Sequence, residues 1–314
     1  MSHQNQNTNT TTLTNPSNIE MNDNNHQETS YTLNFICKHS FILFSIFSVS
    51  MFIIFCVLTT LTLIYSYDID YKFGLNQVIK YVLISIIQYL MALLVEYKNA
   101  KVNYTRKVIH ISYFIFPQLL DIVFFKYKKN IFTELWNIWI IFFLLILLSK
   151  HVRDKISIID FMFKAVDRPE DRPYTLIWFS SQIIATLIVL APFTIYFNEV
   201  DKIGFVFIPI LINGLADGLA EPVGIRFGKH KYKTKACLSN KVYERSYEGS
   251  FCVFIVSTII ILSYYGYMNL YQYIFNVLSI PIIVTLTEAF APHTWDAPLI
   301  FLVTSGLLSL SLLI

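Results

Sequence analysis

Residues 41–67 read FILFSIFSVSMFIIFCVLTTLTLIYSY and contain no charged side chain. About 20 apolar residues are enough to cross the hydrocarbon core of a bilayer as a helix. This stretch is longer than that, and it is too long for the apolar part of a signal peptide. We therefore expect an uncleaved membrane anchor here.

Similar apolar stretches recur along nearly the whole chain. The protein is 55% hydrophobic and only 14% charged, whereas a soluble domain carries about 25% charged residues. The pattern predicts an all-α fold, a polytopic integral membrane helical bundle of about nine transmembrane helices. We expect these helices near residues 41–66, 78–96, 108–125, 131–149, 174–197, 203–222, 249–267, 270–290 and 298–314.

The first 30 residues are polar and rich in Asn, Thr and Gln. Such a segment has little apolar surface to bury, so we expect it to be disordered. It has no arginine and no apolar run, which argues against both a transit peptide and a cleaved signal. The four cysteines of the chain show neither paired nor metal-ligand spacing, so we expect reduced thiols.

Basic residues are distributed unevenly between the two predicted sides of the membrane. The N-terminal tail and the loops between spans 2 and 3, 4 and 5, and 6 and 7 hold 18 of the 24 Lys and Arg residues, and the other side holds 6. Basic loops favour the cytosolic side of a membrane. We therefore place the tail and these three loops in the cytosol, and we predict no nucleic-acid partner.

The most informative polar stretch runs from Asn213 to Lys229. Asn213, Asp217 and Glu221 are spaced by four residues, so on a helix they form one polar stripe. An ionisable group at membrane depth costs about 2.5–3.5 kcal/mol on insertion scales and is usually functional. Two carboxylates one turn apart also repel each other unless a cation lies between them. Mg²⁺ bound to a nucleotide phosphate is one such cation.

The same stretch also has a purely structural interpretation. Gly214 and Gly218 form a pair of small residues four positions apart, and Gly224 and Gly228 repeat that spacing. Pairs of this kind let membrane helices approach closely. We expect the four glycines to pack helices whether or not the two acids are functional.

A basic loop follows at once, with Arg226, Lys229 and Arg245 near its two ends. Lysines at alternate positions from 231 to 235 would line one side of an extended strand. Phosphates and anionic lipid headgroups are both suitable partners for such a loop. Glu248 and Ser250 then open the seventh predicted span, where backbone N–H groups can meet phosphate.

Two more polar groups fall on the predicted cytosolic side. Arg106 and Lys107 enter the third span, with His110 one turn after Arg106. The link between spans 8 and 9 adds two acids and a histidine. They are Glu288, His293 and Asp296. A lone histidine near a helix end is often structural, but four polar groups far apart in sequence converge on one side.

Together these motifs resemble the CTP-dependent lipid kinases, a family that includes phytol kinase, dolichol kinase and CTP-using diacylglycerol kinases. The matching elements are Arg106-Lys107-x-x-His110, the stretch from Ala216 to Lys229, and Arg245-Ser-Tyr-Glu248-Gly-Ser250. The resemblance covers roughly residues 100–300. Three departures from the family pattern are Ala216 for glycine, the inserted Ile225, and Arg245 for lysine.

The resemblance implies that CTP phosphorylates a membrane isoprenoid alcohol of the phytol, dolichol or polyprenol class. It implies Asp217, Glu221, Glu248 and His110 as catalytic residues, with Mg²⁺ on Asp217 and Glu221. It also implies that phosphates are bound by Arg106, Lys107, Arg226, Lys229, Arg245 and Ser250, with Asn213, Glu288, His293 and Asp296 as further candidates. The enzyme would lie in the endoplasmic reticulum membrane with its active site facing the cytosol.

On this interpretation the chain has three parts: a disordered cytosolic tail (1–37), N-terminal spans (38–100) and a membrane-embedded catalytic domain (101–314). Three other functions stay open: a CTP-dependent diacylglycerol kinase, a phosphatidate cytidylyltransferase and a transporter. We find neither the cytidylyltransferase signature nor the internal repeat that is common in transporters.

Overall fold

The computed structural model describes residues 40–65, 71–125, 131–235, 242–292 and 295–314. The contacts divide the chain into two units, one up to Val57 and one from Leu58 to Ile314, and the boundary falls inside the first described helix. The residues of the candidate site all lie in the second unit. The predicted tail, residues 1–37, lies outside the described residues.

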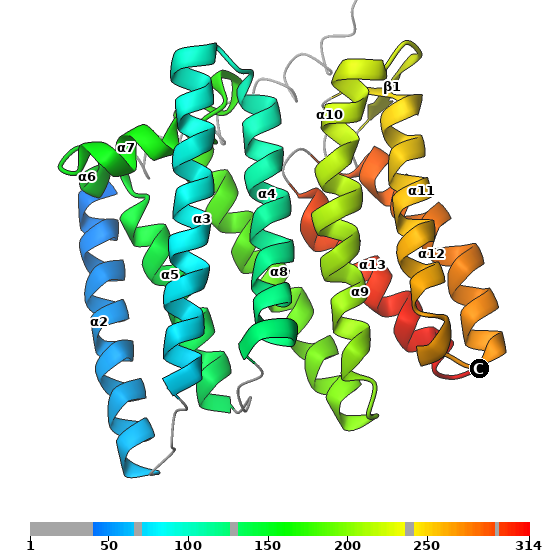
Figure 1. Ribbon diagram of the computed structural model, residues 1–314, viewed down its shortest axis with the longest axis horizontal. Coiled ribbons are helices and arrows are strands. Elements are labelled where there is room, and N and C mark those ends of the chain that lie inside the picture. Colours follow the sequence, from blue (N-terminus) through cyan, green and yellow to red (C-terminus); the bar gives the residue numbers. More distant parts are fainter. Residues whose placement is uncertain (1–39, 66–70, 126–130, 236–241, 293–294) are drawn as a thin grey trace, which may run out of the picture. The chain divides into compact units, whose positions relative to one another are not determined.

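Helices dominate the described chain (Figure 1). The α-helices are α2 (Ser40–Ile64), α3 (Tyr71–Lys98), α4 (Val102–Leu119), α5 (Ile131–Leu147), α6 (Lys150–Arg153), α7 (Ser157–Phe163), α8 (Thr175–Glu199), α9 (Phe207–Leu211), α10 (Gly218–Phe227), α11 (Tyr247–Ser263), α12 (Leu270–Phe290) and α13 (Asp296–Ser311). Two π-helical segments, η1 (Leu120–Phe125) and η4 (Ile212–Asp217), and three short 3₁₀ segments, η2 (Pro169–Asp171), η3 (Ile203–Val206) and η5 (Tyr265–Tyr267), complete the helical elements.

Five stretches are long and apolar enough to cross a membrane, by length and composition. They are Phe41–Ile64, Tyr71–Lys98, Thr175–Glu199, Ile203–Phe227 and Leu270–Phe290. Three shorter apolar helices are Phe132–Leu147, Tyr247–Ser263 and Asp296–Ser311. The chain is thus a helical integral membrane protein, whereas the count of nine spans stays a prediction.

Helix α12 shows why such a protein must be surrounded by lipid. Leu278, Ile282 and Leu286 lie four residues apart and are all exposed. The opposite face of the same helix, including Asn276 and Ile280, is fully buried. An exposed stripe with only apolar side chains is stable against acyl chains and not against water.

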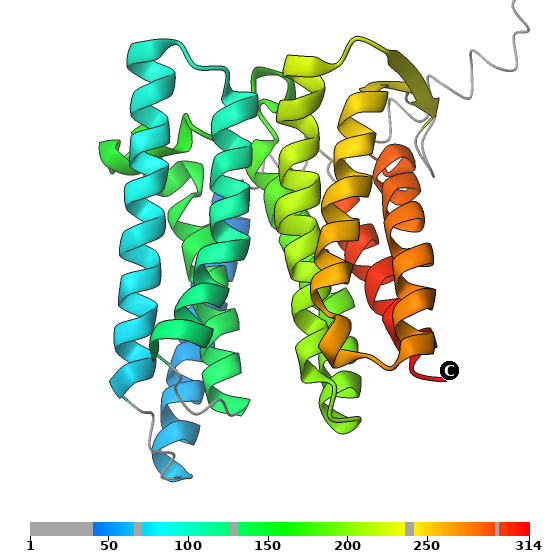
Figure 2. The ribbon, with the colours of Figure 1, turned by 45° about the vertical axis from the view of Figure 1, so that its right-hand side comes forward.

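Helices α4 and α10 lie side by side in both ribbon views (Figures 1 and 2). Glycines make this approach possible. A Cβ added to Gly214 would lie 2.7 Å from Cβ of Phe114, and one on Gly218 would lie 2.5 Å from Cγ1 of Ile111. Both distances are too short for any side chain, so the two backbones can approach only where these residues are glycine.

The basic loop contains a two-stranded antiparallel hairpin, β1 (Lys231–Lys235) and β2 (Val242–Ser246). Lys231 is opposite Ser246 in the register, and Lys233 is opposite Glu244. Ser246 also caps α11, because its Oγ accepts a hydrogen bond of 3.1 Å from the backbone N–H of Gly249. A Cβ on Gly224 would lie 2.8 Å from this oxygen, so glycine lets α10 pack against the cap.

Candidate functional site

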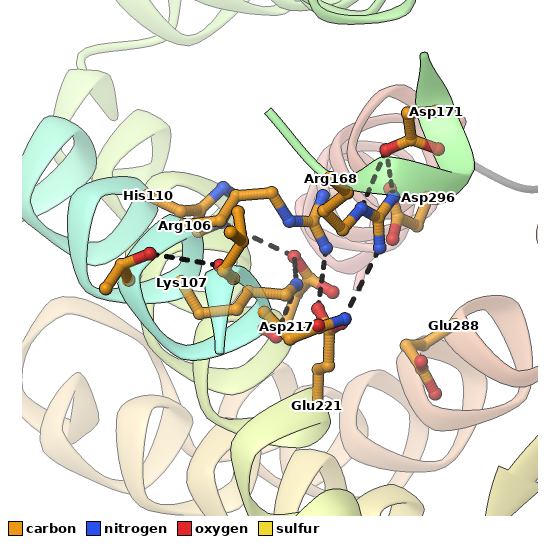
Figure 3. Close-up of polar contacts among 12 residues, drawn as sticks. Arg106, Lys107, His110, Arg168, Asp171, Asp217, Glu221, Glu288 and Asp296 are labelled. Atoms are coloured by element: carbon orange, nitrogen blue, oxygen red, sulfur yellow. Dashed lines mark hydrogen bonds and ion pairs between the residues drawn. The ribbon is translucent and has the colours of Figure 1, made fainter. Parts of the chain in front are cut away.

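The basic side chains of α4 point toward the acids of η4 and α10 (Figure 3). We call this group the α4–α10 cluster, and two of its members come from one span, Ile203–Phe227. Its members are Arg106, Lys107, His110, Arg168, Asp217 and Glu221. The sequence analysis predicted five of the six as site residues, and the structure brings these five together.

Asp217 is almost fully buried and pairs with two side chains of α4. The Nζ atom of Lys107 donates to its Oδ2 at 2.9 Å and to its backbone carbonyl at 3.0 Å. Nε2 of His110 lies 3.4 Å from the same Oδ2 and 3.0 Å from the carbonyl of Asn213. Lys107 thus balances the buried charge, as a buried carboxylate requires.

Both carboxylate oxygens of Glu221 also accept hydrogen bonds. Arg106 donates to Oε2 at 2.6 Å, and the side-chain amide of Asn103 donates to Oε1 at 2.8 Å. A second guanidinium, that of Arg168, lies 3.6 Å from Oε1. The cations that separate Asp217 and Glu221 in this structure are therefore protein side chains from α4 and the loop before α8.

The π-helical segment η4 explains part of this geometry. A π-helical turn interrupts the regular i→i−4 bonding of an α-helix, and such turns are frequent at functional sites. Here His110 and Lys107 contact two carbonyls of the segment, those of Asn213 and Asp217. The side chains of α4 therefore contact both the backbone and the acid of the motif.

Arg168 and Asn103 are site residues that the sequence analysis missed. Arg168 is buried, and its ion pair with Asp171 measures 2.6 Å. It lies in a polar loop whose basic residues were attributed to membrane orientation, and no motif marks it. Asp296, a predicted candidate at the start of α13, accepts a hydrogen bond of 3.0 Å from Gln182.

Glu288 is buried near the end of α12, and Arg245 of β2 forms an ion pair with it. Thr234 of the paired strand β1 lies on the same face of the hairpin as Arg245, and its hydroxyl donates to the carbonyl of Ala289 at 2.9 Å. One face of the hairpin therefore contacts α12. Arg245, predicted to bind phosphate, is engaged by a carboxylate here.

Arg226 and Lys229 do not join the cluster. Both side chains are exposed at and just after the end of α10. Lys231 and Lys233 are exposed on the hairpin, and Lys231 pairs with Glu244 at 2.6 Å. Of the predicted phosphate ligands, Arg226 and Lys229 are thus exposed, whereas Arg106, Lys107 and Arg245 form ion pairs.

Glu248 fixes the hairpin to the start of α11. Its carboxylate accepts hydrogen bonds from the backbone N–H groups of Lys229 and His230 and contacts Nδ1 of His230 at 2.9 Å. Hydrogen bonds from its own backbone N–H and from these groups lower the pKa of Glu248 to about 2. Its neighbour Ser250 contacts the hydroxyl of Tyr232 at 2.5 Å. These contacts position the hairpin, and the catalytic role expected for Glu248 stays a prediction.

His293 lies outside the described residues. Asn213 is fully buried one turn before Asp217, and its side-chain amide has no hydrogen-bond partner within the described chain. Gly228 lies against Ser246, since a Cβ on it would be 2.8 Å from Cβ of that residue.

The carboxylates suit Mg²⁺ in chemistry, although their charge is already balanced. Mg²⁺ in nucleotide sites takes one or two carboxylates together with phosphate oxygens. Asp217 and Glu221 are two such groups, and they would share their oxygens with Lys107 and Arg106. The described residues contain no cluster of three or more His, Cys, Asp or Glu that could hold a metal by itself.

Comparison with known proteins adds no relative: no protein-family model, no characterised protein and no solved structure matches this chain.

Proposed function

We propose that this protein phosphorylates a membrane isoprenoid alcohol with CTP as the donor. One observation carries the proposal. Motif residues about 110 positions apart, Arg106-Lys107-x-x-His110 and Asp217 to Glu221, meet in one network of direct contacts. These are the motifs by which the sequence resembles the CTP-dependent lipid kinases.

The chemistry expected of such a site is in-line transfer of the γ-phosphoryl group. The hydroxyl oxygen of the lipid attacks the γ-phosphorus, the bond to the β-phosphate oxygen breaks, and CDP leaves. Asp217 accepts the hydroxyl proton, and Nε2 of His110, 3.4 Å from its carboxylate, holds that carboxylate in place. Mg²⁺ held by Asp217, Glu221 and phosphate oxygens would neutralise charge on the triphosphate.

The cations of the site would bind the phosphate groups and stabilise their charge. Arg106 and Lys107 pair with the two acids, so on this proposal they would lie close to the transferred group, and fixed cations stabilise developing negative charge strongly. Arg226 and Lys229 are exposed at the end of α10, where a soluble nucleotide can arrive. We place this end in the cytosol and the enzyme in the endoplasmic reticulum membrane.

The decisive experiment follows two labels in CTP. Purified protein in nanodiscs that contain phytol, dolichol, diacylglycerol or phosphatidate receives CTP labelled at the γ- or the α-phosphorus. An isoprenoid kinase moves the γ label into the prenol lipid and releases CDP. Transfer to diacylglycerol alone would change the acceptor class.

Two other results would refute the kinase proposal. Entry of the α label into lipid phosphate substrates, with release of pyrophosphate, would indicate a cytidylyltransferase. No turnover of either label would favour a transporter. An Asp217→Asn variant prepared in parallel controls for contaminating kinases, because only a contaminant would transfer label at an undiminished rate.

A further inference from the structure

Asn213 is a buried polar side chain with no partner. It is 0% exposed, and neither Oδ1 nor Nδ2 has a hydrogen-bond partner within the described chain. Most buried polar side chains in proteins are hydrogen-bonded, and leaving one unbonded costs about 1–3 kcal/mol. An amide retained at such a site therefore calls for a ligand.

The position of Asn213 relates it to the proposed reaction centre. Its backbone carbonyl contacts Nε2 of His110 at 3.0 Å, and His110 lies 3.4 Å from Asp217. Asn213 lies near the middle of the Ile203–Phe227 span, whereas the exposed Arg226 and Lys229 lie at and just after its end. A group bound at Asn213 is thus on the membrane side of Asp217.

The surroundings of Asn213 indicate an uncharged ligand. Ile212, which precedes it, and Ala216, three residues after it, are fully buried and belong to the main apolar core. A phosphate in such surroundings would need a paired cation, whereas a hydroxyl needs only a donor and an acceptor. The amide of Asn213 offers both.

We propose that Asn213 binds the hydroxyl group of the lipid acceptor and holds it beside Asp217. This rests on the proposed function in that the bound alcohol is the one to be phosphorylated. Asn213 is a positioning residue in this view: it orients the hydroxyl, and Asp217 takes the proton.

Binding can be measured without turnover, in the absence of CTP. The probes are tritiated phytol and tritiated diacylglycerol, each with its O-methyl ether as an unlabelled competitor that cannot donate a hydrogen bond. The wild-type protein should bind at least one of the two alcohols more tightly than the corresponding ether, by about fivefold or more. A difference in affinity of about fivefold is the equivalent of one hydrogen bond. Asn213→Leu should remove this preference, and Asn213→Ser should retain part of it.

Asn276→Leu is the matched control. Asn276 is also fully buried, and its amide donates to Ser311 at 3.0 Å, away from the α4–α10 cluster. This variant should unfold at a lower temperature than the wild type and keep the preference for the alcohol. Asn213→Leu should unfold at the same or a higher temperature, because it removes an unbonded polar group from an apolar site.

The outcomes separate the two proposals. An equal preference for alcohol over ether in wild type and Asn213→Leu overturns the assignment of Asn213, whatever CTP does. A wild type that binds no alcohol better than its ether also overturns it. An Asn213-dependent preference without transfer of the γ label supports this inference and refutes the kinase. If Asn213→Leu fails to fold, Asn213→Ser decides: the full wild-type preference would contradict the assignment.

Discussion

The carboxylate of Asp217 is buried in a span, and Lys107, the cation that pairs with it, comes from another helix. Breaking a buried ion pair by removing one partner is strongly destabilising, because the remaining charge is left unpaired. The two motifs are thus coupled in stability as well as in the proposed chemistry. A change at Lys107 should act on folding and activity together.

We expect Asp217→Asn to lower turnover at least about 100-fold, the size of a typical electrostatic contribution to catalysis. The amide keeps the shape of the side chain, so packing at Gly214 and Gly218 should persist and the protein should still accumulate in the membrane. The buried Lys107 loses its partner charge, so the variant should also unfold at a lower temperature than the wild type. Label transfer per unit of membrane protein measures the effect. Near-normal turnover over a range of Mg²⁺ concentrations would mean that the stripe is structural.

The control for this variant is Asp160→Asn. Asp160 is an exposed partner of Arg153 on α7, so the same chemical change there should leave turnover unaltered. A loss of similar size at both positions would point to a general defect in insertion.

At single residues, sequence reasoning identified members of motifs and missed the residues that complete them. Asp217 and Glu221 stand out because acids are rare in apolar runs. Arg168 and Asn103 contact the same Glu221, yet each lies in an ordinary polar loop or helix start. Only the folded chain shows that their distance to the acid is short.

At the scale of elements, the hairpin has two faces with different contacts. The inner face carries Thr234 and Arg245, which contact α12, and the outer face carries Lys231 and Lys233. The proposal assigns nucleotide phosphates to the motif cations and lipid headgroups to the outer lysines.

Replacing Arg226, Lys229 or Arg245 singly with Gln should raise the CTP requirement or lower kcat about tenfold or more, the equivalent of a hydrogen bond to a charged group. Replacing Lys231, Lys233 and Lys235 together should change activity modestly, since each contributes about 1 kcal/mol of headgroup attraction. CTP titrations at matched membrane levels measure both. Equal, small, salt-sensitive losses would mean that the nucleotide binds elsewhere.

The Arg226, Lys229 and Arg245 variants should differ in their unfolding temperatures. Arg245→Gln leaves the buried Glu288 without its cation, so this variant should also unfold at a lower temperature. Arg226→Gln and Lys229→Gln alter exposed side chains and should keep the wild-type unfolding temperature. A destabilised Arg226 variant would contradict this assignment.

Glu248 gives the hairpin a defined dependence on pH. Its folded-state pKa of about 2 lies below the usual 4.5, so its stabilising contribution is complete above about pH 4.5 and is lost as the pH falls toward 2. The N–H groups of Lys229 and His230 should therefore keep their protection from hydrogen exchange from pH 8 to pH 5, after correction for intrinsic rates. Protection should fall below pH 4.5.

Glu248→Gln should reduce this protection from pH 5 to pH 8, where the wild-type carboxylate is charged, because a neutral amide accepts weaker hydrogen bonds than a carboxylate. Glu244→Gln is the matched control, since Glu244 pairs with Lys231 across the hairpin. Unchanged protection at Lys229 and His230 in the Glu248 variant would rule out the proposed fixation.

The apolar pattern predicted the helices correctly where a long stretch of the chain is uniformly apolar. The expected span 270–290 coincides with α12, and 174–197 differs from α8 by two residues or fewer at each end. The span expected at 203–222 continues to Phe227, because Pro222 and Gly224 are compatible with a helix packed against its neighbours. The π-helical segment η4 was not predicted, since no residue pattern distinguishes it from an α-helical turn.

At the scale of the whole molecule, orientation in the membrane is testable through two glycosylation sequons. Asn103-Tyr-Thr105 begins α4 on the predicted cytosolic side, and Asn9 lies outside the described residues. Both should stay unmodified in cells with a glycosylation pathway. The side-chain nitrogen of Asn103, where a glycan would attach, donates to Glu221.

Mass spectrometry of the expressed protein, with and without a glycosidase, checks this prediction. A sequon engineered into the predicted lumenal loop 126–130 serves as the positive control, and it should be modified. A glycan on Asn103 in folded protein would invert the orientation and exclude cytosolic CTP as the donor.

The π-helical segment also sets the rotational phase of its span. Residues before Ile212 pack in the apolar core, and residues after Asp217 present Glu221 toward α4 and Gly224 toward α11. Each residue of an α-helix turns the chain by about 100°, so deleting Leu215 would rotate one half against the other by that angle. Either the core or the glycine contacts would then face the wrong neighbour. Insertions and deletions of one residue should therefore be far less tolerated between 212 and 217 than anywhere in the polar loops, and an alignment of relatives that places a gap there would misassign every face of the span.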